Sequence, residues 1–434
     1  MNLAWPSRLA GVVLVALLAP RPVAAYPTDE YARTGIRRLQ WQFEIDTGVR
    51  KSSRKLAPGA RLTHDQIQLR MTAAGRDFEL TEETPKDPAL QKGLEEILKR
   101  NLFKRYNVAV LDITDPATPR FAAVHENDKQ TPGSVAKVLV GAGMLRLLQE
   151  RFPDDVGPRE AMLKDVRVAA DDWAMFDSHE VPVVTGPKLE NVALRKVKTG
   201  DTFTLWEWMD HALSASNNSA AAMLWREAML MRLMGAEYPP PTWDDALFKR
   251  WDRQAMTEAS FDVVERPARE AGLNLEAFNV YMYFTTHANR YIHAKSSVAT
   301  PLAIIQWLVR MEQGRMVDPW SSLELKKMIY LTRRRVRYAA APELADAAVF
   351  FKSGSLFQCK PEEGFTCVQY EGNEVNVLNA LVEVETPEIP GATAEAPAKK
   401  HVYLVAVMSN ELKRNAAADH GKLASEIHKL ILAR

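Results

Sequence analysis

Apolar residues fall into short continuous runs near the two ends of the chain and into helical periodicities between them. The run at 107–113 is rich in β-branched residues, and apolar runs return at 347–351, 375–384 and 401–407. Runs of this length and composition are typical of strands. Between about 134 and 335 the signals are mainly helical. The pattern predicts an α/β (α+β) fold, in which both chain ends complete one sheet around an inserted helical lobe.

Local signals mark where several helices begin. Apolar residues recur at helical spacing from Leu90 to Leu102, which predicts a helix leading into the first strand. Thr204 and Glu207 stand in the arrangement of a capping box. Ala299-Thr-Pro301 indicates another helix start, and a last helix is expected from about Ala416.

The first residues have the pattern of a secretory signal peptide. Arg8 supplies a positive charge, 9–18 is almost wholly apolar, and 23–25 carries small residues typical of a cleavage site. We expect 1–25 to be removed after Ala25. The apolar run is too short to span a membrane, so we expect a mature protein that is secreted or periplasmic, without a membrane span.

Residues 26–88 form an N-terminal extension ahead of the main domain, which we assign to 89–434. Period-two alternation at 39–45 and 67–71 predicts strands, so we expect the extension to be small and β-rich. Prolines and many charges at 236–262 indicate an insertion within the helical lobe.

Charge and cysteine content narrow the choice of partners. The 434 residues carry a formal net charge of +1, which gives no case for nucleic acid or an anionic membrane surface.

Cys359 and Cys367 are close in sequence, and in an exported protein we expect a disulfide rather than two free thiols. The nine histidines show no His-Glu-x-x-His spacing, and two cysteines alone cannot build a structural zinc site, so no metal or other cofactor is expected.

A Ser-x-x-Lys motif carries the most chemical information. Ser134 and Lys137 open an apolar stretch long enough for a buried helix, which puts hydroxyl and amine one turn apart on one face. The amine can then act as a base for the hydroxyl, giving a nucleophile activated without histidine. Alone, the motif is weak evidence, because most such pairs are surface residues.

Two further motifs follow in order: Ser216-Asn217-Asn218, and Lys352-Ser353-Gly354-Ser355 after an apolar run. With these three elements, residues 89–434 resemble the penicillin-recognising serine hydrolases, the family of serine β-lactamases and D-alanyl-D-alanine peptidases. The resemblance implies a β-lactamase/transpeptidase-like fold, with an antiparallel sheet packed against helices and the site between sheet and lobe.

The resemblance also implies roles for the first two motifs. Ser134 would attack a carbonyl and form an acyl-serine. Lys137 would take the serine proton, provided that its pKa falls from about 10.4 through burial or a neighbouring cation such as Lys352. Ser216 would pass a proton to the departing nitrogen, and Asn218 would hydrogen-bond the substrate amide.

For the third motif, the resemblance implies that Lys352 and Ser353 bind the substrate carboxylate. Gly354 would let the substrate approach the strand closely. The backbone N–H groups of Ser134 and Ser355 would form the oxyanion hole.

Three positions leave alternatives open. Asn217 stands where the family's β-lactamases usually have aspartate, which a side chain turned away from substrate would tolerate. Arg337 could add positive charge near the carboxylate or belong to a solvated basic face at 333–337. Glu270 matches a Glu-x-x-Leu-Asn motif that would supply a deacylating base. We favour the alternative that Glu270 is a solvated side chain at a helix end, with Gly272 at the C-cap.

The sequence therefore predicts a class A β-lactamase-like serine hydrolase that opens β-lactam amide bonds. The alternative is a D-alanyl-D-alanine carboxypeptidase or endopeptidase that acts on peptidoglycan stem peptides and that β-lactams inhibit. A third hypothesis is a sensor that binds such ligands without hydrolysing them. A monomer is expected, and the sequence does not settle the oligomeric state.

Overall fold

The computed structural model describes residues 27–433, with the exception of 52–55, 101, 104, 176, 331–334 and 390–397. The predicted signal peptide, 1–25, therefore lies outside the described residues. Within the described part of the chain, no helix is both long and apolar enough to cross a bilayer.

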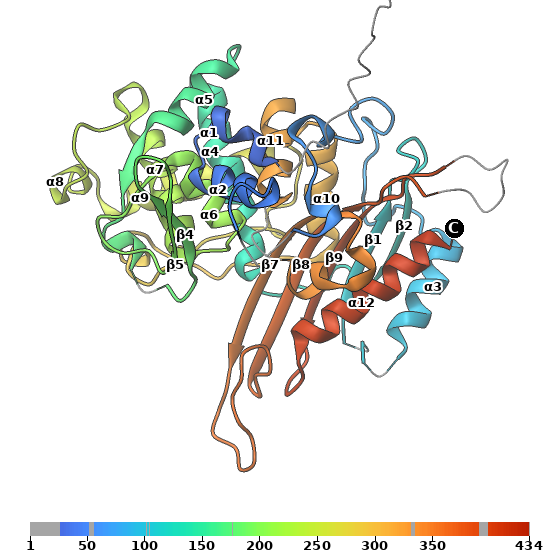
Figure 1. Ribbon diagram of the computed structural model, residues 1–434. Helices are drawn as coiled ribbons and strands as arrows, with labels where there is room; N and C mark the ends of the chain where they lie inside the picture. The colour runs from blue at the N-terminus through green and yellow to red at the C-terminus, as the bar shows by residue number, and fades with distance from the viewer. Residues whose placement is uncertain are drawn as a thin grey trace, which may run out of the picture.

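One antiparallel five-stranded sheet organises the molecule (Figure 1). Its strands are β1 (Asn107–Asp112), β2 (Arg120–Val124), β7 (Ala348–Gln358), β8 (Val375–Glu385) and β9 (Val402–Asn410). Their order across the sheet is β2-β1-β9-β8-β7. The prediction that both chain ends build one sheet is confirmed, and β7 is an edge strand.

Both faces of the sheet are buried. Val108 and Val110 point into a core shared with helices α3 (Pro88–Leu98) and α12 (Ala416–Leu432), which cover one face in Figure 1. Ala109 and Leu111 point into the opposite core, which α10 (Pro301–Glu312) and α11 (Pro319–Tyr330) share. Burial on both faces explains why the strands appear as continuous apolar runs.

The helical lobe is inserted between β2 and β7. It contains α4 (Lys137–Arg151), α5 (Val156–Asp165), α6 (Leu205–Leu213), α7 (Asn218–Met234), α8 (Asp245–Phe248) and α9 (Arg253–Glu270). Two small sheets accompany them: β3 (Arg167–Ala169) with β6 (Thr202–Thr204), and β4 (Val181–Thr185) with β5 (Asn191–Arg195). The predicted capping box at Thr204 is present, with the Glu207 N–H donating to the Thr204 hydroxyl at 3.1 Å.

The N-terminal extension is helical, and the expectation that 26–88 is β-rich was wrong. Its helices are α1 (Tyr31–Thr34) and α2 (Arg37–Asp46), and no strand forms between residue 27 and residue 88 in the described chain. Two arginines hold α2 against α6: Arg37 Nε lies 2.7 Å from Glu207, and Arg38 makes two 2.6 Å bonds to buried Asp210. Period-two alternation over the seven residues 39–45 does not exclude a helix. The ion pairs that Arg37 and Arg38 form with α6 stabilise the helix that is present.

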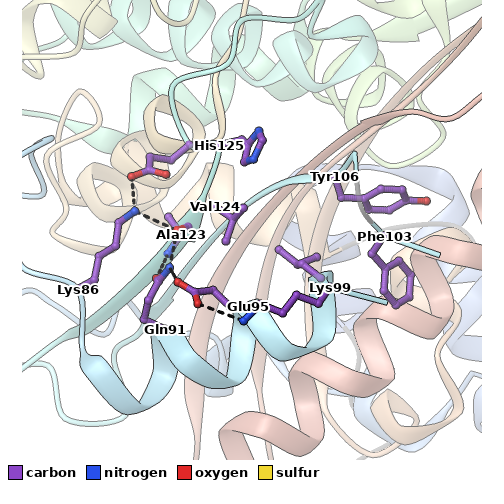
Figure 2. A pocket seen from close by; sticks show the side chains of 11 residues that line it. Lys86, Gln91, Glu95, Lys99, Phe103, Tyr106, Ala123, Val124 and His125 are labelled. Carbon is purple, nitrogen blue, oxygen red and sulfur yellow. Dashed lines mark hydrogen bonds and ion pairs between the residues drawn. The ribbon is translucent and has the colours of Figure 1, made fainter. Parts of the chain in front are cut away.

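The β2 edge of the sheet is covered by α3 and the segment before it. Gln91 accepts a hydrogen bond from the Ala123 N–H (2.9 Å) and donates to its carbonyl (3.1 Å), as a neighbouring strand would. A cavity of about 450 Å³ opens beside these contacts, where Lys86 pairs with Glu126 at 2.6 Å (Figure 2). This cavity lies at the edge opposite β7, and no residue of the three motifs lines it.

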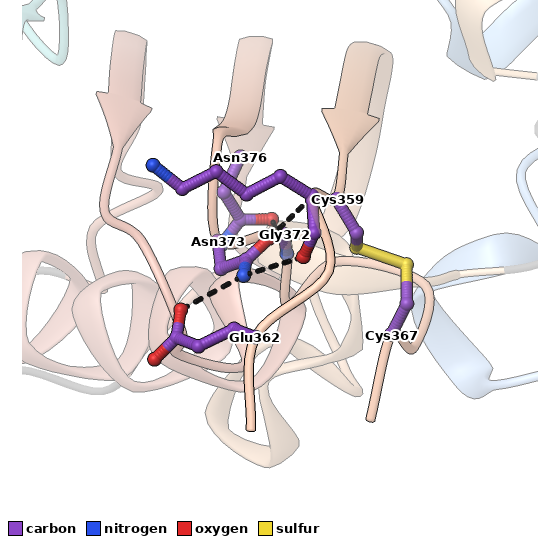
Figure 3. Close-up of a disulfide and its surroundings, with 7 residues drawn as sticks. Cys359, Glu362, Cys367, Gly372, Asn373 and Asn376 are labelled. Atoms are coloured by element: carbon purple, nitrogen blue, oxygen red, sulfur yellow. Dashed lines mark hydrogen bonds between the residues drawn. A yellow bond between two sulfur atoms is a disulfide. The ribbon is translucent and has the colours of Figure 1, made fainter. Parts of the chain in front are cut away.

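Strands β7 and β8 form a long hairpin that extends away from the helices in Figure 1. The Cys359–Cys367 disulfide closes a loop of this hairpin, with the two Cα atoms 5.9 Å apart (Figure 3). The predicted disulfide is therefore present in the structure, directly beyond the strand that carries the Lys-Ser-Gly motif.

Candidate active site

Strand β7 passes directly against the turn that holds Ser134. This turn is a short 3-10 helix, Gly133–Ala136, which leads into α4. A Cβ atom on Gly354 would lie 2.3 Å from the Pro132 carbonyl oxygen and 2.7 Å from the Ser134 nitrogen. Only glycine fits at this crossing. The first and third motifs are thereby in contact, with the half-buried Ser134 side chain between lobe and sheet.

The Lys137 amine joins the first motif to the second. Its side chain is 0% exposed, and Nζ donates to the Ser216 carbonyl at 2.6 Å and to the Asn218 amide oxygen at 2.7 Å. Nζ also lies 4.9 Å from the centroid of the Phe284 ring. No carboxylate of the described residues forms a hydrogen bond or ion pair with this amine. It is therefore a buried amine held by neutral acceptors.

This environment sets the protonation state of Lys137. Burial lowers the pKa of Lys137 to about 7, and the attraction of the Asp177 carboxylate opposes the shift. A neutral amine has two hydrogens and one lone pair. The hydrogens are directed to Ser216 and Asn218, and Ser134 lies three residues, about one helical turn, before Lys137.

Ser216 lies between two lysines. Its carbonyl accepts from Lys137, and its hydroxyl accepts from Lys352 Nζ at 2.7 Å. The Ser216 backbone has φ of +57°, a left-handed conformation that is rare outside glycine and that occurs often at functional sites. Burial, followed by the positive charges of Lys137 and Arg337, holds the pKa of Lys352 well below its ordinary value.

The two asparagines of the second motif have different surroundings. Asn217 is fully buried and caps α7, accepting from the Ala220 N–H at 2.7 Å and donating to the His179 carbonyl at 2.9 Å. Its side chain therefore points into the lobe, which explains why aspartate is not needed there. Asn218 is half-buried and directs its amide oxygen to Lys137.

Asp177 is a site residue that the sequence analysis missed. One carboxylate oxygen accepts from the Asn218 and Ser219 N–H groups at 2.6 and 3.2 Å, and the other lies 2.7 Å from His179 Nδ1. Burial alone would raise the pKa of Asp177, but the hydrogen bonds and charge of His179, together with Lys137, hold it below the ordinary value. Nothing in local spacing links this loop residue to Lys137.

Arg337 lies against the third motif, whereas 333 and 334 of the predicted basic face lie outside the described residues. Its guanidinium donates to the hydroxyls of Ser353 and, at 3.3 Å, Ser355. It also donates to the Tyr370 hydroxyl at 2.6 Å. The hydroxyls of Ser353, a predicted carboxylate ligand, and of Ser355, whose N–H is predicted for the oxyanion hole, therefore face the same cation.

Glu270 lies elsewhere. It is the last residue of α9, is about half exposed (47%), and pairs with Arg146 at 2.6 Å and Arg266 at 3.3 Å. Arg146 stands more than two turns beyond Lys137 on α4, and its hydrogen bond lowers the pKa of Glu270. The helix then ends through Gly272 at φ +74°. The structure agrees with the helix-end interpretation that we favoured.

Comparison with known proteins gives similarities of structure only. No family model matches the sequence, and no curated protein matches it. Among solved structures, the chain is similar to PBP-A (12% identity, 81% of this chain and 99% of that chain, TM-score 0.49). It is also similar to a class A β-lactamase from Bacteroides cellulosilyticus (14% identity, 80% of this chain and 100% of that chain, TM-score 0.49). A third similar structure is a β-lactamase from Sphaerobacter thermophilus (13% identity, 79% of this chain and 95% of that chain, TM-score 0.48).

Proposed function

We propose that this protein is a penicillin-recognising serine hydrolase that forms an acyl-serine at Ser134. One observation carries the proposal: Lys137 is buried between Ser216 and Asn218, one turn from Ser134, with a pKa near neutrality. An amine in this state is a base at neutral pH, whereas an exposed lysine is not.

In the proposed reaction, the Ser134 hydroxyl attacks the amide carbonyl while its proton moves to the Lys137 lone pair. The developing oxyanion is held by the N–H groups of Ser134 and Ser355. The carbon–nitrogen bond then breaks, and the departing nitrogen takes the proton of the Ser216 hydroxyl. Lys352 replaces that proton across its 2.7 Å hydrogen bond, while the Ser134 proton stays on Lys137. The product of this half-reaction is an ester on Ser134, which water must hydrolyse to complete turnover.

The carboxylate of the substrate would bind beside Lys352, Ser353 and Arg337. Burial lowers the pKa of Lys352, and without an anion the positive charges of Lys137 and Arg337 lower it further. A bound carboxylate would reverse that effect by stabilising the charged amine. The site is therefore suited to an anionic acyl donor, either a β-lactam or a peptide that ends in a D-amino acid.

A specific observation favours the peptidase alternative over an efficient β-lactamase. Hydrolysis of the acyl-serine requires a base for water, and Glu270 is engaged with Arg146 and Arg266 away from Ser134. Phe284, an apolar ring, covers the Lys137 amine instead. Asp177 already accepts from two backbone N–H groups and His179. We therefore propose slow deacylation, as in a D-alanyl-D-alanine peptidase that β-lactams inhibit.

Benzylpenicillin distinguishes these activities. We expect the mature protein to gain one penicilloyl adduct on Ser134, seen by intact mass and peptide mapping, while β-lactam absorbance falls by about one equivalent. Ser134→Ala should gain none, and Ser296→Ala, which changes an exposed serine, should react like the wild type. Rapid loss of excess penicillin would favour the β-lactamase, and absence of both adduct and turnover would contradict the proposal.

A further inference from the structure

Tyr370 holds the guanidinium of Arg337 from two directions. The Tyr370 hydroxyl accepts from Arg337 Nη2 at 2.6 Å, and the guanidinium carbon lies 4.7 Å from the centroid of the ring. The hydroxyl also accepts from Gln369 at 2.9 Å. An arginine side chain has many rotamers, and a hydrogen bond combined with a cation–π contact selects one of them.

The selected rotamer determines what Arg337 does to the third motif. Its other donors reach the hydroxyl oxygens of Ser353 and Ser355. Because each oxygen accepts from the guanidinium, each O–H hydrogen is free to point away from it. Arg337 therefore supplies positive charge and also turns two hydroxyl donors toward a common anion.

Both members of the Arg337–Tyr370 pair have unusual backbone conformations. Arg337 has φ of +58° and Tyr370 has φ of +69°, although neither is glycine. Such conformations are sparsely populated and persist where surrounding contacts impose them. Because both residues of this contact have such a conformation, we infer that the surrounding fold holds their side chains together.

The segment that carries Tyr370 is anchored on several sides. The Cys359–Cys367 disulfide closes the preceding loop, and Asn373 bonds the backbone of Lys360 in both directions, at 2.9 and 3.0 Å (Figure 3). On the other side, the Ala416 N–H donates to the Tyr370 carbonyl at 3.1 Å. The disulfide loop thus fixes the backbone from which Tyr370 reaches the site.

We propose that Tyr370 is a positioning residue for Arg337, and that the disulfide loop thereby makes the site selective for acyl donors with a free carboxylate. The inference rests on the proposed function. It assigns a specificity role to a loop that contributes none of the three motifs.

Benzylpenicillin and its neutral methyl ester test this inference, with acylation of Ser134 followed by mass at a series of concentrations. In Tyr370→Phe we expect the half-saturating concentration of benzylpenicillin to rise about tenfold, the change for one lost hydrogen bond to a charged group. The limiting acylation rate should stay unchanged, and so should the reaction of the ester. Tyr281→Phe, a matched change beside Phe261 in the lobe, should leave both reagents unaffected.

A second variant covers the case in which Tyr370→Phe folds poorly. Replacement of both Cys359 and Cys367 by serine should raise the half-saturating concentration of the acid in the same direction, with the ester unaffected. Equal losses for acid and ester, or no change in either variant, would overturn the role of Tyr370 while wild-type acylation still supports the proposed function. A wild-type protein that neither reagent acylates would overturn both.

Discussion

Two lysines of this protein are equally buried, and their surroundings give them opposite properties. Lys137 and Lys326 are both 0% exposed. Lys137 faces a carbonyl, an amide oxygen and an aromatic ring, and its pKa falls to about 7. Lys326 faces the carboxylates of Glu312, Glu383 and Glu385 at 2.9, 2.7 and 2.8 Å, and its pKa is raised.

The difference shows that burial alone does not determine the pKa of a lysine. Desolvation lowers the pKa of both amines. The carboxylates around Lys326 more than offset that shift, whereas the attraction of Asp177 for Lys137 does not. Lys326 stays charged and helps to join the N-terminal extension to the sheet, since Arg70 of the extension also binds Glu385. Lys137 can lose its proton near neutral pH, which is the property that a general base requires.

Of the substitutions that test this comparison, the largest effect is expected from replacing Lys137. Lys137→Ala should lower the second-order rate constant for acylation of Ser134 by about 10³-fold, because the hydroxyl loses its base. Folding should be preserved, as judged by circular dichroism, and Lys99→Ala on the exposed surface serves as the control. Acylation at the wild-type rate would show that Lys137 is not the base.

The reciprocal change at Lys326 should affect stability rather than chemistry. Lys326→Met leaves three buried carboxylates without their shared cation, so we expect a loss of about 3–5 kcal/mol in the free energy of unfolding. Denaturant titration measures this loss, with Lys422→Met, which changes an exposed lysine, as the control. Acylation by the folded fraction should stay normal, and a specific loss of acylation would remove the contrast between the two lysines.

Local sequence signals predicted much of the fold, because strand runs and helix caps depend on neighbouring residues. The extension was misassigned because α2 depends on distant ion pairs, such as Arg38 with Asp210. For the same reason, the three motifs were visible in the sequence while other site residues were not. Asp177, Phe284 and Tyr370 have no local signature, and only folding brings them to Lys137 and Arg337.

The pH dependence of Ser134 acylation tests the central claim, that Lys137 acts as a neutral base, most directly. The rate constant should rise with pH and reach half its maximum at about pH 7, where the amine loses its proton. Asp177→Asn removes an anion that raises the pKa of Lys137, so the midpoint should move to lower pH in that variant. A midpoint at about pH 10.4, the ordinary lysine value, or a rate independent of pH through neutrality, would contradict the account.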